Sequence, residues 1–399
     1  MFSISHRLSL FFVGALCAAA CSRTQDSPPA SLPDGSVSSS HQPAPPSSAP
    51  APAAPLASVE PAAPAAPSPR EFTAQFSGFS EGDRYFFSDN YISNETSYLQ
   101  VADELEPRGG AYVGVGPEQN FTYIARTRPE VAYIVDIRRG NALLHLMYKG
   151  IFHAAKNRSE FVARLVGREG ALEETPGASL AQVLEAGAGS PASDAEFERV
   201  HASLLHYIQK DLGVRLSAKD LETLRDTHSA FFKQRLDLRF ELHQKNGRHY
   251  PSLGELLQAK SASGTGSFLA QAADYEFLRQ MQERHQIVPI VGDFAGDQAL
   301  AKLAEELERR KLTVSVFYTS NVEQYLMEPE TWKRWVRNVE ALPTNAESVF
   351  VRCYLDQGRR HPKQLEGHRT ATLIQPFSHF EATQQKRGYK SFWQLVNDD

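Results

Sequence analysis

The chain has 399 residues, with 42 lysines and arginines against 47 aspartates and glutamates and a formal net charge of −5. This nearly balanced charge, without a basic stripe, argues against a nucleic-acid-binding protein. The three cysteines are too few for the disulfide framework that holds small secreted domains together.

The N-terminal residues have the pattern of an export signal. His6 and Arg7 precede an apolar run over residues 8–20, which is too short to span a bilayer of roughly 30 Å as a helix. Small residues then lead to Cys21 and resemble the lipobox of bacterial lipoproteins, in which the cysteine becomes the lipidated N-terminus. We therefore expect a signal peptide over residues 1–21 with a lipidated Cys21. Ordinary secretion with cleavage nearby remains the alternative.

Residues 22–70 have a biased composition. They hold 13 of the chain's 24 prolines, interleaved with alanine and serine, and no aromatic residue. Such a segment buries too little apolar surface to offset the entropy of ordering it, so we expect a disordered tether. If the tether were wholly polyproline II, it would reach roughly 150 Å.

These features predict a protein of the cell envelope, attached to the membrane through the lipid on Cys21, with its globular part outside the cytoplasmic membrane. No later segment is apolar for 18 residues, so no further membrane span is expected. Cys17 leaves with the signal peptide, and Cys353 reads as a buried small hydrophobic residue rather than a nucleophile. The histidines show no paired spacing such as HExxH, so no metal site is expected.

From residue 71 aromatic residues become frequent, and residues 71–399 are long enough for one α/β domain. Residues 111–113 predict a strand entering a glycine turn, residues 120–127 a helix, and the β-branched run 131–137 a second strand. This order is a βαβ unit of a parallel sheet. Residues 141–164 have the apolar spacing of a helix.

The middle of the chain predicts a helical insertion over about residues 165–286. Residues 167–191 are rich in glycine, alanine and glutamate and predict a loose connection. Helices are then expected at 194–212, 218–244 and 268–286.

The alternation of strands and helices resumes after the insertion. Strands are expected at 287–291, 312–318 and 348–354, and helices at 297–311 and 328–340. The pattern predicts an α/β fold with a doubly wound, mainly parallel sheet of the Rossmann-like type.

The glycine turn and one acid carry the main functional signal. Gly114 and Gly116 let the backbone turn tightly after the first strand, and Asp136 ends the next strand 20 residues after Gly116. An acid at that position can accept hydrogen bonds from ribose hydroxyls. Glu118 stands where a pyrophosphate would bind, and its charge would repel one. S-adenosylmethionine carries no phosphate and has a cationic sulfonium, so the acidic turn favours it over NAD.

At this point the sequence resembles the class I S-adenosylmethionine-dependent methyltransferases. It is also similar to an uncharacterised bacterial family that shares the blocks GVGPEQN, VDIRR and YTSNVEQYL. The resemblance implies a methyltransferase-type fold and S-adenosylmethionine as cofactor, with Asp136 at the ribose and Asp293 at the adenine amino group. The implied cofactor-binding residues are Gly114, Gly116, Pro117, Glu118, Asp136, Asp293 and Phe294. Tyr318 and Asn321 follow the fourth strand and are the candidate catalytic residues.

The chain departs from the methyltransferase pattern in three places. No acid stands two positions before Gly114, the third glycine of the motif is missing, and 155 residues separate Asp136 from Gly292. These departures bear more on activity than on fold.

Three polar segments near these motifs allow two interpretations each. Residues 89–95 form a lid over the ligand, through Asn90, Ser93, Asn94 and Glu95, or a loop in which Ser93 or Asn94 caps a helix. Arg138 and Arg139 are a solvated pair or contact an acidic substrate. Ser320 and Asn321 cap a helix or face the reaction centre.

Two functions remain open. The first is an enzyme that transfers a methyl or related group from S-adenosylmethionine to an acceptor. The second is a non-catalytic envelope binding or scaffold protein on a degenerate methyltransferase-like fold, which the location favours because S-adenosylmethionine is not supplied outside the cytoplasm. They differ in whether Gly114, Gly116 and Asp136 line an open pocket or are blocked by neighbouring side chains.

Overall fold

The computed structural model describes residues 66–170, 172–243 and 249–398. The expected signal peptide, Cys21 and most of the expected tether lie outside the described residues. Within the described ranges, no helix is long and apolar enough to cross a membrane.

A six-stranded sheet forms the centre of the described part, in the order β3-β2-β1-β4-β5-β6. Its strands are β1 Ala111–Gly114, β2 Val131–Asp136, β3 Ile287–Val291, β4 Val314–Ser320, β5 Val349–Leu355 and β6 Thr370–Pro376. Strands β1 to β5 run parallel, and β6 pairs antiparallel with β5. The first three are buried along their whole length, as is usual for parallel strands covered on both faces. The predicted α/β fold with a mainly parallel sheet is confirmed.

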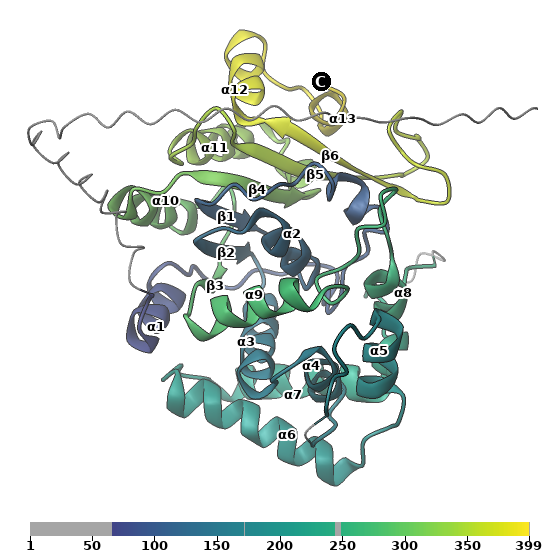
Figure 1. Ribbon diagram of the computed structural model, residues 1–399. Helices are drawn as coiled ribbons and strands as arrows, with labels where there is room; N and C mark the ends of the chain where they lie inside the picture. The colour runs from purple at the N-terminus through teal and green to yellow at the C-terminus, as the bar shows by residue number, and fades with distance from the viewer. Residues whose placement is uncertain (1–65, 171, 244–248, 399) are drawn as a thin grey trace, which may run out of the picture. The chain divides into compact units, whose positions relative to one another are not determined.

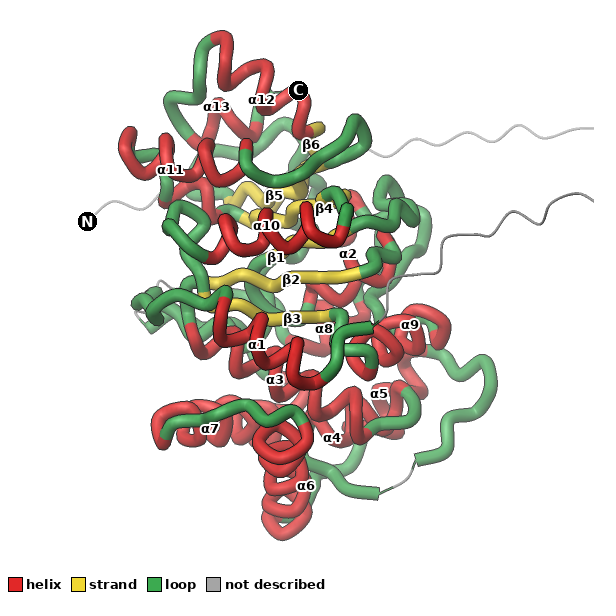
Figure 2. The backbone as a smooth tube through the Cα atoms, turned by 90° about the vertical axis from the view of Figure 1, so that its left-hand side faces the viewer, coloured by secondary structure: helices red, strands yellow, loops and turns green. Residues whose placement is uncertain are grey.

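Helices cover both faces of the sheet (Figures 1 and 2). One face carries α1 (Pro69–Gly78), α10 (Ala299–Arg310) and α11 (Pro329–Glu340), and the other carries α2 (Gln119–Thr127) and α3 (Arg139–Ala154). The helices that lead from β1 to β3 thus lie on one face, and those that lead from β3 to β5 lie on the other, as a doubly wound sheet requires.

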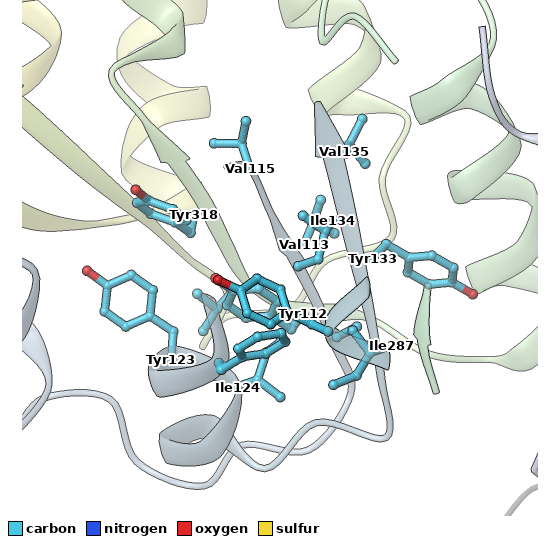
Figure 3. Packing of buried hydrophobic residues seen from close by; sticks show 14 of the residues in the cluster. Tyr112, Val113, Val115, Tyr123, Ile124, Tyr133, Ile134, Val135, Ile287 and Tyr318 are labelled. Atoms are coloured by element: carbon cyan, nitrogen blue, oxygen red, sulfur yellow. The ribbon is translucent and has the colours of Figure 1, made fainter. Parts of the chain in front are cut away.

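The tyrosines of the sheet show how the alternating strand residues fill these two layers. Tyr112, Tyr123 and Tyr318 gather on the α2 side, whereas Tyr133 points away from them (Figure 3). The rings of Tyr123 and Tyr318 meet edge to face at 5.1 Å. On the opposite face, Phe317 packs against Trp335 of α11 at 5.6 Å. The core therefore has one layer on each side of the sheet.

The helix predicted over residues 141–164 is two helices, α3 and α4 (Arg158–Leu165). The break follows from Ala155 and Asn157, which both have extended backbones. The Asn157 side chain accepts a hydrogen bond from the Glu160 amide at 2.9 Å and so starts a new helix.

The insertion is helical, as predicted, but its connections differ from the expectation. Its helices are α5 Leu180–Ala188, α6 Asp194–His206, α7 Ala218–Gln234, α8 Leu253–Gln258 and α9 Ala272–Glu283. The loose connection expected at 167–191 contains α5, because Ser179 and Gln182 form a capping box. Helix α7 ends at Gln234, ten residues before the predicted end, because the next residue, Arg235, has φ +54°. Figure 1 shows α4 to α7 gathered beside α3, on the β3 side of the sheet.

No element is predicted beyond residue 354, yet β6 and two helices follow. These helices are α12 Phe377–Lys386 and α13 Phe392–Val396. A short 3-10 helix at Tyr98–Val101 also packs beside β6.

Candidate functional site

The side chain of Asn120 stabilises the glycine turn after β1. The Asn120 amide nitrogen donates to the carbonyls of Val115, Gly116 and Pro117 at 2.9, 3.1 and 2.8 Å. A Cβ on Gly114 would lie 2.0 Å from Asn120 Oδ1, so this position requires glycine. Gly116 has φ +79°, in the left-handed region, and a Cβ there would meet no atom within 4 Å. The turn is thus rigid on the Asn120 side and open at Gly116.

The Asp136 side chain is held by Arg138, two residues further along the chain. One carboxylate oxygen accepts a hydrogen bond from the Arg138 amide at 2.9 Å, and the other pairs with the Arg138 guanidinium at 3.1 Å. Arg138 also donates to the backbone carbonyl of Asp89. Both Asp136 oxygens therefore already have partners, and the side chain is buried.

The interpretation of Arg138 and Arg139 as a solvated pair is wrong. Arg138 is buried against Asp136. Arg139 makes two hydrogen bonds to Asp220 of α7, at 2.6 and 2.9 Å. Such a bidentate arrangement fixes the start of α3 to the insertion.

Residues 79–97 run along the carboxyl ends of the strands, and we call them the strap. At β3 the amide of Glu81 donates to the Val291 carbonyl at 2.7 Å. At β2 the amide of Arg84 donates to the Ile137 carbonyl at 3.0 Å. The beginning of the strap therefore covers the ends of two neighbouring strands.

The end of the strap reaches β1 and β4 and contains the predicted lid residues. The Ser93 amide donates to Glu118 at 3.2 Å, just before α2. Glu95 accepts a hydrogen bond from the Tyr318 hydroxyl of β4 at 2.7 Å. Asn94 lies between them and is half-buried, while Asn90 accepts from the Ser88 hydroxyl within the strap. The strap crosses the edge where a doubly wound sheet binds its ligand.

Glu95 is the centre of a buried polar cluster at the end of β4. Gln119 donates to Glu95 at 3.1 Å and to the Tyr318 hydroxyl at 2.6 Å. The Ser320 hydroxyl also donates to Glu95. Only neutral donors surround this carboxylate, and no ion pair is found for it among the described residues. Burial raises the pKa of Tyr318 well above its ordinary value, so this phenol remains a donor near neutral pH.

The interpretation of Ser320 and Asn321 as helix caps is not what the structure shows. Asn321 precedes the 3-10 helix Val322–Tyr325 without a capping hydrogen bond from its side chain. Ser320 has φ +53° and turns its hydroxyl toward Glu95. Ser93 also caps no helix, because its oxygen accepts from the Glu95 amide.

The residues implied for adenine binding divide between the surface and the core. Asp293 forms an ion pair with Arg84 of the strap and accepts from the Ala295 amide at 2.8 Å. Phe294 turns into the core and packs against Phe317 at 5.0 Å. Of the two, only Asp293 therefore contacts the strap.

Glu118 faces the strap and a small cavity. Its side chain is buried, one carboxylate oxygen accepts from Ser93, and the other has no hydrogen-bond partner. Burial raises the pKa of Glu118 to about 7. The cavity lies between α2, the strap and the α8 region, and it has room for about one water-sized group.

His145 belongs to the site, although nothing in its spacing indicates this. Its Nε2 lies 2.9 Å from the Gly116 carbonyl, and burial lowers the pKa of His145 to about 4. It stands between Leu144 and Leu146 of α3, so the sequence suggests packing. Neutral His145 donates from Nε2 to the Gly116 carbonyl and so holds the glycine turn.

The site is closed in this arrangement. Gly116 is open, but Asp136 is covered by Arg138 and by the strap. A nucleoside would therefore enter only if the strap moved. Within the described ranges, no group of three or more histidine, cysteine, aspartate or glutamate side chains could hold a metal ion.

A family model described as a domain of unknown function, DUF7790, matches residues 91–398. No curated protein matches the chain.

Proposed function

The chain belongs to the DUF7790 family, and we propose that it is a lipid-anchored envelope protein whose methyltransferase-like domain binds S-adenosylmethionine or a related nucleoside beneath the strap. The observation that carries this proposal is the sheet topology together with its loops. The glycine turn and Asp136 stand at the carboxyl ends of β1 and β2, next to β4.

The strand order supports a nucleotide-type crevice. In the order β3-β2-β1-β4-β5-β6, the chain adds β2 and β3 on one side of β1 and then β4, β5 and β6 on the other. The order of the strands therefore reverses between β1 and β4. Ligands of doubly wound sheets bind at this switch point, outside the carboxyl ends of the strands. The antiparallel β6 departs from an all-parallel dinucleotide-binding sheet and is typical of the methyltransferase type.

The charge of the crevice supports a cationic ligand. Glu95 is 2% exposed and is surrounded by neutral donors. A buried carboxylate without a basic partner is stabilised when a cation binds next to it. The sulfonium of S-adenosylmethionine is such a cation, and it would supply an activated methyl group.

The residues of this chain would then act through binding and alignment. Opening of the strap would uncover Asp136, whose carboxylate oxygens each have a second lone pair and could accept from ribose hydroxyls while paired with Arg138. Tyr318, fixed by Gln119, would border the acceptor together with Asn321. Alignment of two reactants is the main requirement of methyl transfer.

A second candidate is a non-catalytic binding or scaffold protein on the same fold. The specific observation in its favour is the ion pair of Asp136 with Arg138, which occupies both carboxylate oxygens. The expected location outside the cytoplasmic membrane also favours this non-catalytic function.

A calorimetric titration separates the two candidates. The purified full chain would be titrated with S-adenosylmethionine and with S-adenosylhomocysteine, its neutral thioether product. We expect saturable binding, tighter for the sulfonium, and at least about tenfold weaker in Asp136→Ala, because two charge-assisted hydrogen bonds are lost. Asp297→Ala, an exposed carboxylate beyond β3, is the matched control and should bind like the wild type. Lack of binding by a folded chain would favour the scaffold protein.

A further inference from the structure

The cavity next to Glu118 is separate from the glycine turn and is walled by the insertion. Tyr98 and Ser93 line it from the N-terminal side, and Thr122 of α2 from the sheet side. Ser267 and Phe268, which follow α8, close it from the insertion. Nothing in the proposed nucleoside site requires this cavity.

The lining offers acceptors and no free donor. The hydroxyl hydrogens of Tyr98 and Ser267 are donated to the carbonyls of Leu256 and Leu257, at 2.8 and 2.7 Å. Ser93 donates its hydroxyl hydrogen to Gln119. A hydroxyl that has donated its hydrogen still has lone pairs and can accept. A group in the cavity must therefore be a donor.

The remaining side-chain donors of the lining are the Thr122 hydroxyl, which forms a hydrogen bond with the Tyr98 phenol, and the nitrogen of Gln119, which is also used elsewhere. It donates to Glu95 and to Tyr318, at 3.1 and 2.6 Å. The second oxygen of Glu118 has no partner and is buried. A buried acceptor without a partner costs about 1–3 kcal/mol, and more when it is charged, so this oxygen indicates a missing donor.

The rings of Tyr98 and Phe268 add a further preference. Aromatic faces attract ammonium groups through their quadrupole, and carboxylates attract them through charge. A hard metal ion prefers about six oxygen ligands with several carboxylates, whereas Glu118 is the single carboxylate among the lining residues. A water molecule would satisfy the oxygen but leave its charge uncompensated.

We propose that this cavity binds an ammonium ion, with Glu118 as its counter-ion and the hydroxyls of Tyr98 and Ser267 as further acceptors. The insertion thereby supplies the wall that limits the size of the cation. Glu118, which the sequence places in the nucleoside site, turns toward this cavity and the strap instead, so the proposal does not depend on nucleoside binding.

The experiment uses ammonium chloride as the probe for the full chain at pH 8. Thermal unfolding should show a saturable increase in Tm with ammonium, and none with tetramethylammonium chloride at equal ionic strength, since that cation has no N–H. Glu118→Gln should weaken the apparent affinity at least about tenfold, because it removes the counter-ion. The exposed carboxylate variant Glu330→Gln is the control and should respond like the wild type.

Two further measurements keep the proposal testable if Glu118→Gln folds poorly. Leu257→Ala, which enlarges the cavity, should shift the preference from ammonium toward methylammonium by at least about tenfold. In the wild type, the response should be weaker at pH 5.5, where Glu118 is protonated.

The ionisable groups that face Glu118 are Tyr98 and Tyr148, and both stay neutral over this range. His145 supports the adjoining turn and is also neutral, because burial lowers its pKa to about 4.

A saturable response that disappears in Glu118→Gln, or at low pH, supports the ammonium site. An absent response in the folded wild type at pH 8, or an equal response in Glu118→Gln, overturns it and assigns the cavity to a water molecule. The nucleoside titration is unaffected by either result.

Discussion

Arg352 of β5 and Glu323 after β4 form an ion pair in the interior. Their side chains are 2% and 0% exposed, and two hydrogen bonds of 2.6 and 3.0 Å join them. Arg352 also lies over the Phe350 ring at 4.1 Å. The pair fixes the short helix that follows Tyr318 and Asn321, so it positions the loop at the end of β4.

Removing one partner of this pair should destabilise the protein strongly. Arg352→Met leaves the Glu323 carboxylate buried without a cation, which costs about 3–5 kcal/mol of unfolding free energy. Urea denaturation monitored by circular dichroism would measure the loss. The exposed pair Lys333–Glu330 is the control, and Lys333→Ala should cost less than about 1 kcal/mol. Equal losses in the two variants would contradict a structural role for the buried pair.

The histidines His201 and His228 show a contact that their spacing in the sequence does not indicate. Their Nδ1 atoms are 3.2 Å apart, and His228 Nε2 lies 3.1 Å from the Arg164 carbonyl. His228 therefore donates from Nε2 to the carbonyl and accepts from His201 at Nδ1. This arrangement requires the His228 ring to be neutral.

Stability should fall at acid pH because of this pair. Burial lowers the pKa of His228 to about 4, below its ordinary value of 6.5. Between these values the unfolded chain binds the proton and the folded chain does not, so unfolding becomes easier as pH falls from about 6.5 to 4. His228→Gln should reduce this pH dependence by up to about 3 kcal/mol. Unfolding free energies at pH 7 and pH 4.5 would test it, and an unchanged difference would count against it.

At the scale of elements, the strap is held at its beginning by a helix terminus. The Glu81 carboxylate accepts from the Gln298 and Ala299 amides at 3.0 and 2.7 Å. It thereby satisfies two of the free amides at the N-terminus of α10 and interacts favourably with the helix dipole. The position of the strap over β3 depends on this contact.

Glu81→Ala should loosen the strap without unfolding the domain. The loss of capping should cost about 1–2 kcal/mol, and hydrogen exchange should increase in residues 79–97 and at the start of α10. Hydrogen exchange read by mass spectrometry would locate the change. Asp83→Asn, two residues away, keeps the oxygen that accepts from the Arg139 amide at 2.7 Å and serves as the control. Unchanged exchange in Glu81→Ala would show that the strap is held by other contacts.

At the scale of the whole molecule, the expected lipid anchor and tether decide where the domain acts. Residues 22–70 contain 13 of 24 prolines and would reach roughly 150 Å if wholly polyproline II. Such a tether would let the domain search a wide zone beside the membrane.

Replacement of Cys21 tests the anchor. In Cys21→Ser the thiol needed for lipidation is absent, so we expect the protein to disappear from the membrane fraction. Cell fractionation with immunoblotting would measure this, and Cys17→Ser, within the signal peptide, is the matched control. Normal membrane attachment of Cys21→Ser would contradict lipidation.

Much of the fold follows from the sequence by itself. Five of the six strands lie within two residues of their predicted bounds, because buried β-branched runs between glycine and helix signals have few alternatives. The glycine turn and the helix after it can also be predicted from the sequence, since a GxG is recognised from consecutive residues. The break between α3 and α4 depended on one Asn157 cap, and helical periodicity does not report such a cap.

The tertiary structure alone decided which polar groups meet. Glu95 and Tyr318 are 223 residues apart in sequence and share a hydrogen bond, and Asp293 meets Arg84 only because the strap crosses β3. The partners of a side chain depend on how distant elements pack, which local periodicity and capping do not specify. The sequence therefore determined the sheet and the glycine turn, and the export signal and the tether stay predictions from it. The closed strap and the unpaired oxygen of Glu118 arose only from the packing of the insertion and strap against α2.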